Sequence, residues 1–358
     1  MADIEHARGI INEVDAQMAE LFVRRMKAAE EVAAYKKERG LPILDAAREN
    51  VVIEQNAARV AEPYKAYYVS FLRALMEQSR GYQRFLNSGM RVAFSGVEGA
   101  FADVAARKIF PDAETCPCTD FAAAYRAVEQ GKCEVAVLPL ENSYNGDVGQ
   151  VMDLAFFGPL FVHQIRGVEV VQHLLGVPGA TVSDVREVVS HPQALGQCAE
   201  YIRNNGLAVR EAVNTAVAAK EVAAIGKKEI AAIGSEEAAK AYGLVKLEAH
   251  INTSGGNTTR FAVFSSVKKE HSDADDAFVL LFTVNNEAGS LGRAIDVIGR
   301  YGFNLRALKS RPTKKLSWSY YFYAEGEGNI YSLEGQRMLA ALKGCCNDLK
   351  VLGSFIKE

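Results

Sequence analysis

A polar run at residues 255–261 has the residue types expected at the floor of a binding site. Two glycines come first, and three residues with neutral hydrogen-bonding side chains follow them. Arg260 and Phe261 end the run. Glycine lets the backbone approach a ligand closely, and a polar turn that leads straight into a buried strand often carries a site. A plain polar loop before a strand explains the same residues equally well, so this run needs support from the rest of the chain.

A second candidate set lies in residues 1–88. Arg25 and Lys36 differ by about 20° in angular position on a helix, so they share one face. Arg8 lies roughly 25 Å before Arg25 on the same helix and about 100° round, so it could serve only the ligand of a partner chain. The remaining members form an i, i+3, i+4 cluster and an i, i+4 pair: Asp45, Arg48, Glu49, Ser79 and Gln83. Any one of these residues fits a surface ion pair, but the whole pattern favours a site.

Helices are needed to position these residues. Apolar residues recur at helical spacing through residues 2–39, which contain no proline, and Gly40 and Pro42 end the segment. Two further helices are expected over residues 45–60 and 64–86. The first helix would be roughly 57 Å long, which is too long to bury its apolar stripe within so short a module. We therefore expect an all-α module that forms an intertwined helical homodimer or a higher homo-oligomer.

This helical pattern resembles the all-helical chorismate mutase family, whose motif matches at Arg8, Arg25, Lys36, Asp45, Arg48, Glu49, Ser79 and Gln83. The resemblance implies rearrangement of chorismate to prephenate. That reaction needs a dicarboxylate held in a compact conformer and donors at the breaking ether bond, rather than a nucleophile. By the resemblance, Arg25 and the partner's Arg8 bind carboxylates, and Lys36 and Gln83 donate to the ether oxygen. Asp45 and Glu49 orient the ring hydroxyl and Lys36, with Arg48 and Ser79 as further substrate-binding residues.

Residues 90–268 change to an alternation of strands and helices. A buried strand at 134–138 leads into the hydrogen-bonding residues Glu141, Asn142 and Ser143, and sites in α/β sheets lie beyond the carboxyl ends of strands. Further strands are expected at 90–95, 188–190, 208–212, 230–233 and 246–251. A second lobe is expected from about residue 167, and the chain returns to the first lobe through 255–261. Two crossing segments between two lobes are typical of a periplasmic-binding-protein-like fold with a cleft.

This module resembles prephenate dehydratase through Gly96 and Gly99, residues 138–143 with Gly146, and residues 190–195, 214–216 and 259–261. The resemblance implies loss of CO2 and hydroxide from prephenate, with Thr259 donating a proton to the leaving group after polarisation by Arg260 or a relay. It places Glu141, Asn142, Ser143, Thr215, Arg260 and Phe261 at the substrate. His191 starts a helix and has either a structural or a site role. Ala102 and Asn214 depart from the family pattern, which leaves arogenate open as the substrate.

Residues 275–358 show the βαββαβ order of a ferredoxin-like α+β fold. They resemble an ACT regulatory domain, which binds amino acids at subunit interfaces. A glycine-small-leucine turn matches at Gly289, Ser290 and Leu291, and a Glu-Ser-Arg-Pro motif matches at Ser310, Arg311 and Pro312, with Lys309 in place of the glutamate. The resemblance implies phenylalanine as an effector. A plain turn and strand end also fits these residues.

Composition limits the function further. The chain has 358 residues, 49% of them hydrophobic, and a formal net charge of −3, which favours neither nucleic acid nor a membrane surface as partner. Six cysteines fit neither a zinc site nor a disulfide framework, and the first residues resemble no signal peptide, so we expect a cytoplasmic protein. No metal or cofactor is expected, since neither of the two implied reactions moves electrons or needs a metal. The whole chain is thus expected to be multidomain: residues 1–88, 90–268 and 275–358. A non-catalytic, amino-acid-sensing binding protein is the alternative of a different class.

Overall fold

The computed structural model describes residues 4–253, 256–313 and 319–357. Ala2, Gly255 and Ser317, which fall within expected elements, lie outside these ranges. The chain divides into two compact units: a helical unit of residues 1–91 and 130–132, and an α/β unit of residues 92–129 and 133–358. The expected domain borders near residues 268 and 275 lie inside the second unit and stay a prediction.

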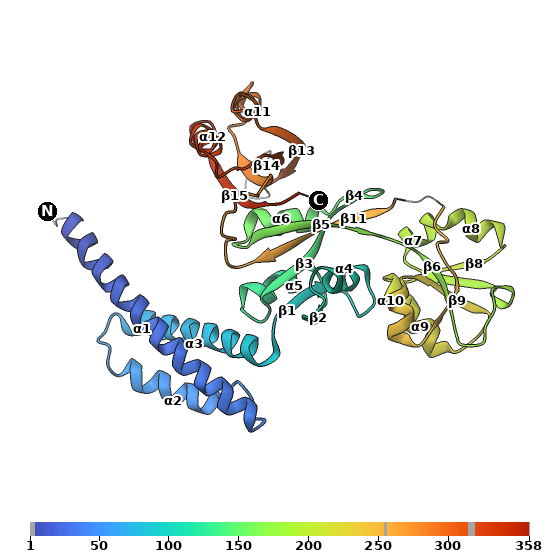
Figure 1. Ribbon diagram of the computed structural model, residues 1–358, viewed down its shortest axis with the longest axis horizontal. Coiled ribbons are helices and arrows are strands. Elements are labelled where there is room, and N and C mark those ends of the chain that lie inside the picture. The colour runs from blue at the N-terminus through green and yellow to red at the C-terminus, as the bar shows by residue number, and fades with distance from the viewer. Residues whose placement is uncertain (1–3, 254–255, 314–318, 358) are drawn as a thin grey trace. The chain divides into compact units, whose positions relative to one another are not determined.

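The helical unit contains α1 (Ile4–Glu38), α2 (Ala46–Ala57) and α3 (Lys65–Ser88). Gly40 adopts a φ of 62° after α1, a left-handed conformation that favours glycine and ends the helix. The Asp45 carboxylate accepts a hydrogen bond from Arg48 N at 2.9 Å and caps α2. Helices α1 and α2 both pack on α3. The N-terminal end of α1 extends beyond α3 (Figure 1). The helices therefore agree with the sequence prediction to within a few residues.

The first lobe of the α/β unit is built on a six-stranded sheet, in which β4 pairs with β3 beside the main order β2-β1-β3-β11-β5. Its elements are β1 (Arg91–Ser95), α4 (Phe101–Ile109), β2 (Glu114–Cys118), α5 (Phe121–Glu129), β3 (Val135–Asn142), β4 (Gly146–Asp147), α6 (Gly149–Phe157), β5 (Phe161–Glu169) and β11 (Thr258–Ser265). The late strand β11 lies antiparallel between β3 and β5, which places Thr259 opposite Asn142 and Arg260 opposite Glu141. Residues about 117 positions apart in sequence thus become cross-strand neighbours.

The second lobe has a five-stranded sheet of order β10-β6-β9-β7-β8. Its elements are β6 (His173–Gly176), η1 (Val182–Asp184), β7 (Glu187–Ser190), α7 (Pro192–Gln197), α8 (Ala199–Asn204), β8 (Ala208–Glu211), α9 (Thr215–Ile225), β9 (Ile230–Gly234), α10 (Glu236–Tyr242) and β10 (Val245–Glu248). The chain enters this lobe after β5 and leaves it before β11, so two segments cross between the lobes (Figure 1). The expected two-lobed α/β architecture is confirmed.

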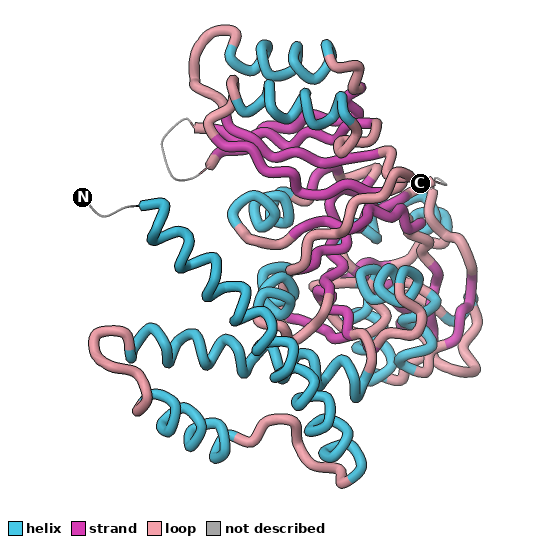
Figure 2. Tube along the Cα trace, turned by 60° about the vertical axis from the view of Figure 1, so that its left-hand side comes forward, coloured by secondary structure: helices cyan, strands magenta, loops and turns pink. Residues whose placement is uncertain are grey.

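The C-terminal segment of the α/β unit, here called the C-terminal layer, forms an antiparallel sheet of order β13-β14-β12-β15. Its elements are β12 (Ala277–Thr283), α11 (Ser290–Arg300), β13 (Asn304–Pro312), β14 (Tyr320–Glu327), α12 (Leu333–Lys343) and β15 (Asp348–Phe355). Both helices cover one face of this sheet (Figure 2). The element order agrees with the βαββαβ prediction.

Strand β12 is buried along its whole length because both of its faces are covered. Phe278, Leu280 and Phe282 pack under α11 and α12. The alternate residues, Val279 and Leu281 among them, join the hydrophobic core of the first lobe. Since successive strand residues point to opposite faces, one strand supplies two cores. The C-terminal layer therefore packs continuously with the first lobe.

Strands β2, β4, β5 and β6 are absent from the sequence expectations. Strands β2 and β5 lie at the two edges of the first sheet, where alternation is incomplete and polar residues interrupt the pattern. None of the six cysteines, all of which lie in the described ranges, is joined to another in a disulfide, and the expected cytoplasmic location stays a prediction. Within the described ranges, none of the helices combines the length and apolar character needed to cross a bilayer.

Candidate active sites

The first candidate site, the helical pocket, is a cavity of about 170 Å³ among α1, α2 and α3. Seven of the eight polar residues predicted in residues 1–88 line it: Arg25, Lys36, Asp45, Arg48, Glu49, Ser79 and Gln83. Ile43, Val52 and Met76 complete the wall with apolar side chains. Three helices thus bring cationic, anionic and neutral donor groups to one partly apolar cavity.

Hydrogen bonds hold the cationic groups of the helical pocket in place. Arg25 donates to Ser79 Oγ, and Lys36 Nζ donates to the backbone carbonyl of Ile43. Burial lowers the pKa of Arg25 from its ordinary value, against an opposing effect of Glu49. Gln83 is 8% exposed, and its Oε1 has no hydrogen-bond partner among the described residues. A buried amide of this kind favours a ligand as the missing partner.

Arg80 also lines the helical pocket, although it was not among the residues predicted from the sequence. Its guanidinium donates to Glu49 Oε1. Its position in the sequence could have indicated Arg80, because it directly follows Ser79 and lies three residues before Gln83 on α3. Glu49 is therefore oriented by an arginine of its own unit.

Arg8 does not reach the helical pocket of its own chain. It lies near the N-terminal end of α1, where it is exposed and pairs with Glu5 at 2.7 Å. The separation follows from the rise of about 1.5 Å per residue along a straight helix. Its expected role in the pocket of a partner chain stays a prediction.

The second candidate site, the interlobe cleft, is a cavity of about 640 Å³ lined by both lobes of the α/β unit. That volume suits a small organic ligand. Helices α4, α6 and α9 all begin at its wall, through Phe101, Gly149 and Thr215. Helix N-termini carry unpaired N–H groups and partial positive charge. Because no lysine or arginine stands among the described lining residues, these helix ends supply the positive potential of the cleft.

Thr259 lies on β11 at the wall of the cleft and is 9% exposed. Its Oγ1 accepts a hydrogen bond from Asn142 Nδ2 at 2.9 Å. Asn142 is in turn fixed, because it donates to Asn257 Oδ1 at 2.8 Å and accepts from Tyr144 N at 3.0 Å. Since the amide occupies the acceptor side of the hydroxyl, the Thr259 O–H remains available as a donor.

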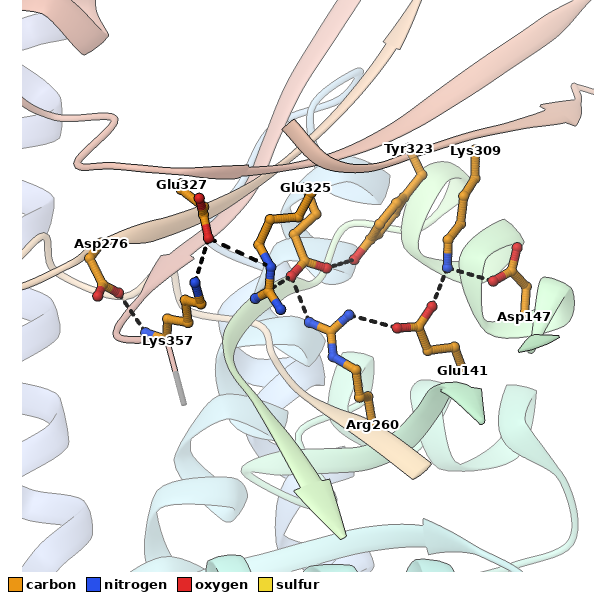
Figure 3. A network of polar contacts seen from close by, with 10 residues as sticks. Glu141, Asp147, Arg260, Asp276, Lys309, Tyr323, Glu325, Glu327 and Lys357 are labelled. Carbon is orange, nitrogen blue, oxygen red and sulfur yellow. Dashed lines mark hydrogen bonds and ion pairs between the residues drawn. The ribbon is translucent and has the colours of Figure 1, made fainter. Parts of the chain in front are cut away.

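Arg260 has different partners from those that the sequence suggested. Side chains alternate along a strand, so Arg260 points away from the face that carries Thr259 and Phe261. Its guanidinium donates to Glu141 Oε1 at 2.8 Å and to Glu325 Oε1 at 2.6 Å (Figure 3). Burial alone would lower the pKa of Arg260, but the hydrogen bonds with Glu325 and Glu141 raise it. The expected contact of Arg260 with Thr259 is therefore corrected: Arg260 is engaged with two glutamates, whereas Asn142 donates to the Thr259 hydroxyl. Polarisation of Thr259 through a relay stays a prediction.

The other predicted cleft residues divide into two groups. Thr215 and Phe261 line the cavity, as does His191, whose Nδ1 also caps α7 by accepting from Gln193 N at 3.3 Å. Glu141 and Ser143 make contacts elsewhere: Ser143 Oγ accepts from Thr258 N at 3.0 Å and braces β11. The predicted cap of α9 is confirmed, since the side chain of Asn214 accepts from Val217 N at 2.7 Å.

Gly99 joins the two lobes. It adopts a φ of 81°, and a Cβ added there would lie 2.5 Å from Ala238 Cα in the second lobe. Ser235 Oγ also donates to its carbonyl at 2.6 Å. The second glycine of the predicted loop thus permits close packing of the lobes, whereas Phe101 and Ala102 just after it line the cleft.

Four glutamines that were not predicted as site residues line the cleft: Gln150, Gln172, Gln193 and Gln197. Gln172 is 2% exposed, and its Oε1 has no partner among the described residues. It lies in the first crossing segment, between β5 and β6, where no periodicity marks a site residue. Gln193 falls within residues 190–195, which carry part of the family resemblance, but only the fold places its side chain at the cavity.

The predicted regulatory residues lie on two parts of the C-terminal layer. Gly289 adopts a φ of 82° and begins α11, followed by buried Ser290 and by Leu291. On β13, Ser310 and Pro312 are exposed, whereas Arg311 donates to Asp153 Oδ1 of α6 at 2.8 Å. Lys309 donates to both Glu141 and Asp147 of the first lobe (Figure 3).

Comparisons with known proteins match the two stretches of the chain that carry the candidate sites. A family model described as chorismate mutase type II matches residues 7–84, and one described as prephenate dehydratase matches residues 92–269. The bifunctional chorismate mutase/prephenate dehydratase of Enterobacter agglomerans is 31% identical over 98% of this chain and 95% of its own length. Arogenate dehydratase/prephenate dehydratase 1 of Arabidopsis thaliana is 33% identical over 75% of this chain and 72% of its own length.

A solved structure extends the comparison to the fold. The prephenate dehydratase of Arthrobacter aurescens in complex with L-Phe is 25% identical, with a TM-score of 0.69, over 75% of this chain and 90% of that chain. Fold, pockets and matches together define an enzyme with two sites in aromatic amino acid biosynthesis. The chain belongs to the bifunctional chorismate mutase/prephenate dehydratase family, and it converts chorismate to prephenate and prephenate to phenylpyruvate. The alternative of a non-catalytic binding protein does not hold.

Proposed function

We propose that the helical pocket carries out the mutase reaction and the interlobe cleft carries out the dehydration. The observation that carries the proposal is the convergence of Arg25, Lys36 and Gln83 from two helices on one cavity. Cationic and neutral donors around a small cavity suit a dicarboxylate that rearranges without a nucleophile. Thr259, on a different unit of the chain, supplies the donor in the second site.

In the helical pocket, Arg25 binds a carboxylate of chorismate, and Lys36 and Gln83 donate to the ether oxygen as its bond to carbon breaks. Glu49 orients Lys36, and Asp45 orients the ring hydroxyl. Arg80 fixes Glu49 through their ion pair. All of these groups are in place before the substrate binds. Preorganised donors stabilise developing charge without reorganisation during the reaction.

A homodimer completes this pocket with the partner's Arg8. The apolar residues of α1, including Ile10, Ile11 and Leu21, are more than half exposed in the single chain. A groove of about 700 Å³ runs between α1 and α3, lined by such residues as Phe22 and Phe71. Exposed apolar area of this extent on a long helix favours pairing with a second copy.

In the interlobe cleft, Thr259 donates a proton to the departing hydroxyl of prephenate. The electron pair of the breaking bond to the carboxylate carbon then completes the aromatic ring, CO2 and water leave, and the Thr259 alkoxide regains its proton from solvent, which releases hydroxide overall. Asn142 orients the hydroxyl of Thr259, and the N-termini of α4, α6 and α9, together with Thr215, bind carboxylate oxygens. Aromatisation supplies the driving force, so one well-placed donor is sufficient.

The C-terminal layer is proposed to be an ACT domain that binds phenylalanine and inhibits the dehydratase. The βαββαβ order, the turn at Gly289 and the L-Phe complex of the Arthrobacter aurescens relative support this proposal. Lys309 contacts the first lobe, so a change in the C-terminal layer reaches strands β3 and β4 directly. If saturating phenylalanine leaves the dehydratase rate unchanged, the proposed regulation is refuted.

The assignment of the two sites is tested by supplying chorismate to the purified protein and measuring phenylpyruvate by its absorbance in alkali. Arg25→Ala should abolish the reaction from chorismate but leave the reaction from prephenate. Thr259→Ala should let prephenate accumulate. Loss of both reactions in either variant, with the fold intact, would contradict separate sites. Rates with prephenate and arogenate, measured side by side, show whether arogenate is a substrate as well and which of the two the cleft prefers.

A further inference from the structure

Lys309 links the C-terminal layer to two acidic residues of the first lobe, one of which lines the interlobe cleft. It projects from β13, is 18% exposed, and donates from Nζ to Glu141 on β3 and to Asp147 on β4 (Figure 3). Burial alone would lower the pKa of Lys309, but the hydrogen bonds with Asp147 and Glu141 raise it. The ammonium therefore stays protonated at neutral pH and balances negative charge on the first lobe.

Asp147 has a particular place in the cleft. It lines the cavity beside Gly146, Val148 and Gly149, and it is the sole carboxylate among the described lining residues. Because it lies on the cavity wall, its charge acts on a ligand in the cavity, although a side chain that is 40% exposed is partly screened by solvent. Glu141, in contrast, lies outside that lining and is also paired with Arg260. Asp147 is thus the group whose charge would oppose an anionic ligand.

We propose that Lys309 determines the substrate charge that the cleft accepts, because its ion pair with Asp147 masks the one acidic group on the described wall. The proposal rests on the assignment of the cleft to the dehydratase reaction. Prephenate enters with two carboxylates, and the positive potential available to them comes from helix N-termini rather than from lysine or arginine. An unmasked Asp147 would repel such a dianion, whereas it would attract an ammonium group.

The consequence concerns selectivity between two closely related substrates. Prephenate carries a keto group at the position where arogenate carries an amine. With Lys309 in place, Asp147 is engaged and the cleft favours the more anionic keto acid. Without Lys309, the free carboxylate shifts the preference towards the amine. The C-terminal layer therefore contributes a specificity-determining residue to the site in the first lobe.

The test compares steady-state kinetics of the full-length Lys309→Gln and Lys309→Arg variants with prephenate and arogenate. We expect Lys309→Gln to raise KM for prephenate about tenfold, which corresponds to about 1.4 kcal/mol, with a much smaller change in kcat. KM for arogenate should fall or stay unchanged, and Lys309→Arg should behave like the unaltered protein. Lys343→Gln, on α12 of the same layer, is the matched control. Mutase activity of each variant reports that the helical unit is folded, and urea unfolding of the same samples reports that the α/β unit is folded.

A second variant separates charge from a purely structural tether. In the double variant Lys309→Gln with Asp147→Asn, KM for prephenate should return to within about threefold of its original value, because no acid remains on the described wall. The defect of the single variant should also shrink as salt rises, since Asp147 is partly exposed. An unchanged KM in Lys309→Gln, or a defect that Asp147→Asn does not relieve, would overturn the proposal. Dehydratase activity that survives in Thr259→Ala would instead show that the cleft assignment itself is wrong.

Discussion

Replacement of Thr259 by valine removes one hydroxyl from the wall of the cleft and keeps the shape of the side chain. Both residues are β-branched and suit the same strand position. We expect kcat of the dehydratase to fall by about 10²- to 10⁴-fold, the usual contribution of a positioned proton donor. KM for prephenate should change by less than about threefold, because the hydroxyl acts in the transition state.

The structure allows the chemical effect to be separated from the structural one. Valine loses the hydrogen bond from Asn142 Nδ2, which was 2.9 Å long, at a net cost of about 1 kcal/mol. Asn142 keeps its other partner, Asn257 Oδ1, at 2.8 Å. The expected loss in kcat corresponds to about 3–5 kcal/mol of activation free energy. The chemical effect therefore exceeds the loss of stability severalfold.

The assay is the release of phenylpyruvate from prephenate, together with urea unfolding of the same samples. Thr258→Val is the matched control, because the neighbouring threonine has its hydroxyl 3.5 Å from the carbonyl of Gly256 and does not line the described wall of the cleft. It should keep nearly full activity. A Thr259→Val variant with more than about a tenth of the original kcat would refute the role of this hydroxyl as proton donor.

Three further predictions concern the remaining sites. Arg8→Ala and Arg25→Ala should each abolish mutase activity. An equimolar mixture of the two variants that exchanges subunits should recover up to about a quarter of the original activity, because half the dimers are mixed and each mixed dimer has one complete pocket of two. If the mixture recovers no activity, the pocket is not shared between subunits. The mutase rate should be flat between about pH 6 and 8 because Gln83 is neutral and donates at any pH, and a steep fall in that interval would contradict its role. Burial alone would raise the pKa of Glu141, but the hydrogen bonds and charges of Lys309 and Arg260 lower it in the folded state. The ionised Glu141 therefore stabilises the fold above the ordinary glutamate pKa of 4.5, and this stabilisation is lost as the pH falls through the lowered pKa. Unfolding free energies of the unaltered protein and of Glu141→Gln should accordingly converge in acid, and a difference that grew with acidity would contradict the ion pairs.

Much of the fold was predictable because its signals are local. Helical periodicity located α1, α2 and α3 to within a few residues, and the strand–helix alternation indicated the two lobes. The helical pocket was also predictable, since spacing along rigid helices determines which residues share a face. Of its polar lining, only Arg80 was missed.

The cleft was less predictable because its residues come from loops and crossing segments. Gln172 had no sequence signal, although it is buried at the wall with an unpartnered oxygen. Arg260 was expected to act on Thr259, but strand alternation turns the two side chains to opposite faces. The partners available on each face depend on the sheet order, which places β11 between β3 and β5.

The sequence by itself determined the order of the modules, the chemistry of the side chains and the faces on which helical residues lie, because each depends on residues a few positions apart. Only the tertiary structure decided what Lys309 contacts, how β12 supplies two cores and which carboxylate stands in the cleft. Those outcomes depend on pairings between segments more than 100 residues apart. Such pairings are selected by the packing of whole sheets, and no local pattern encodes them.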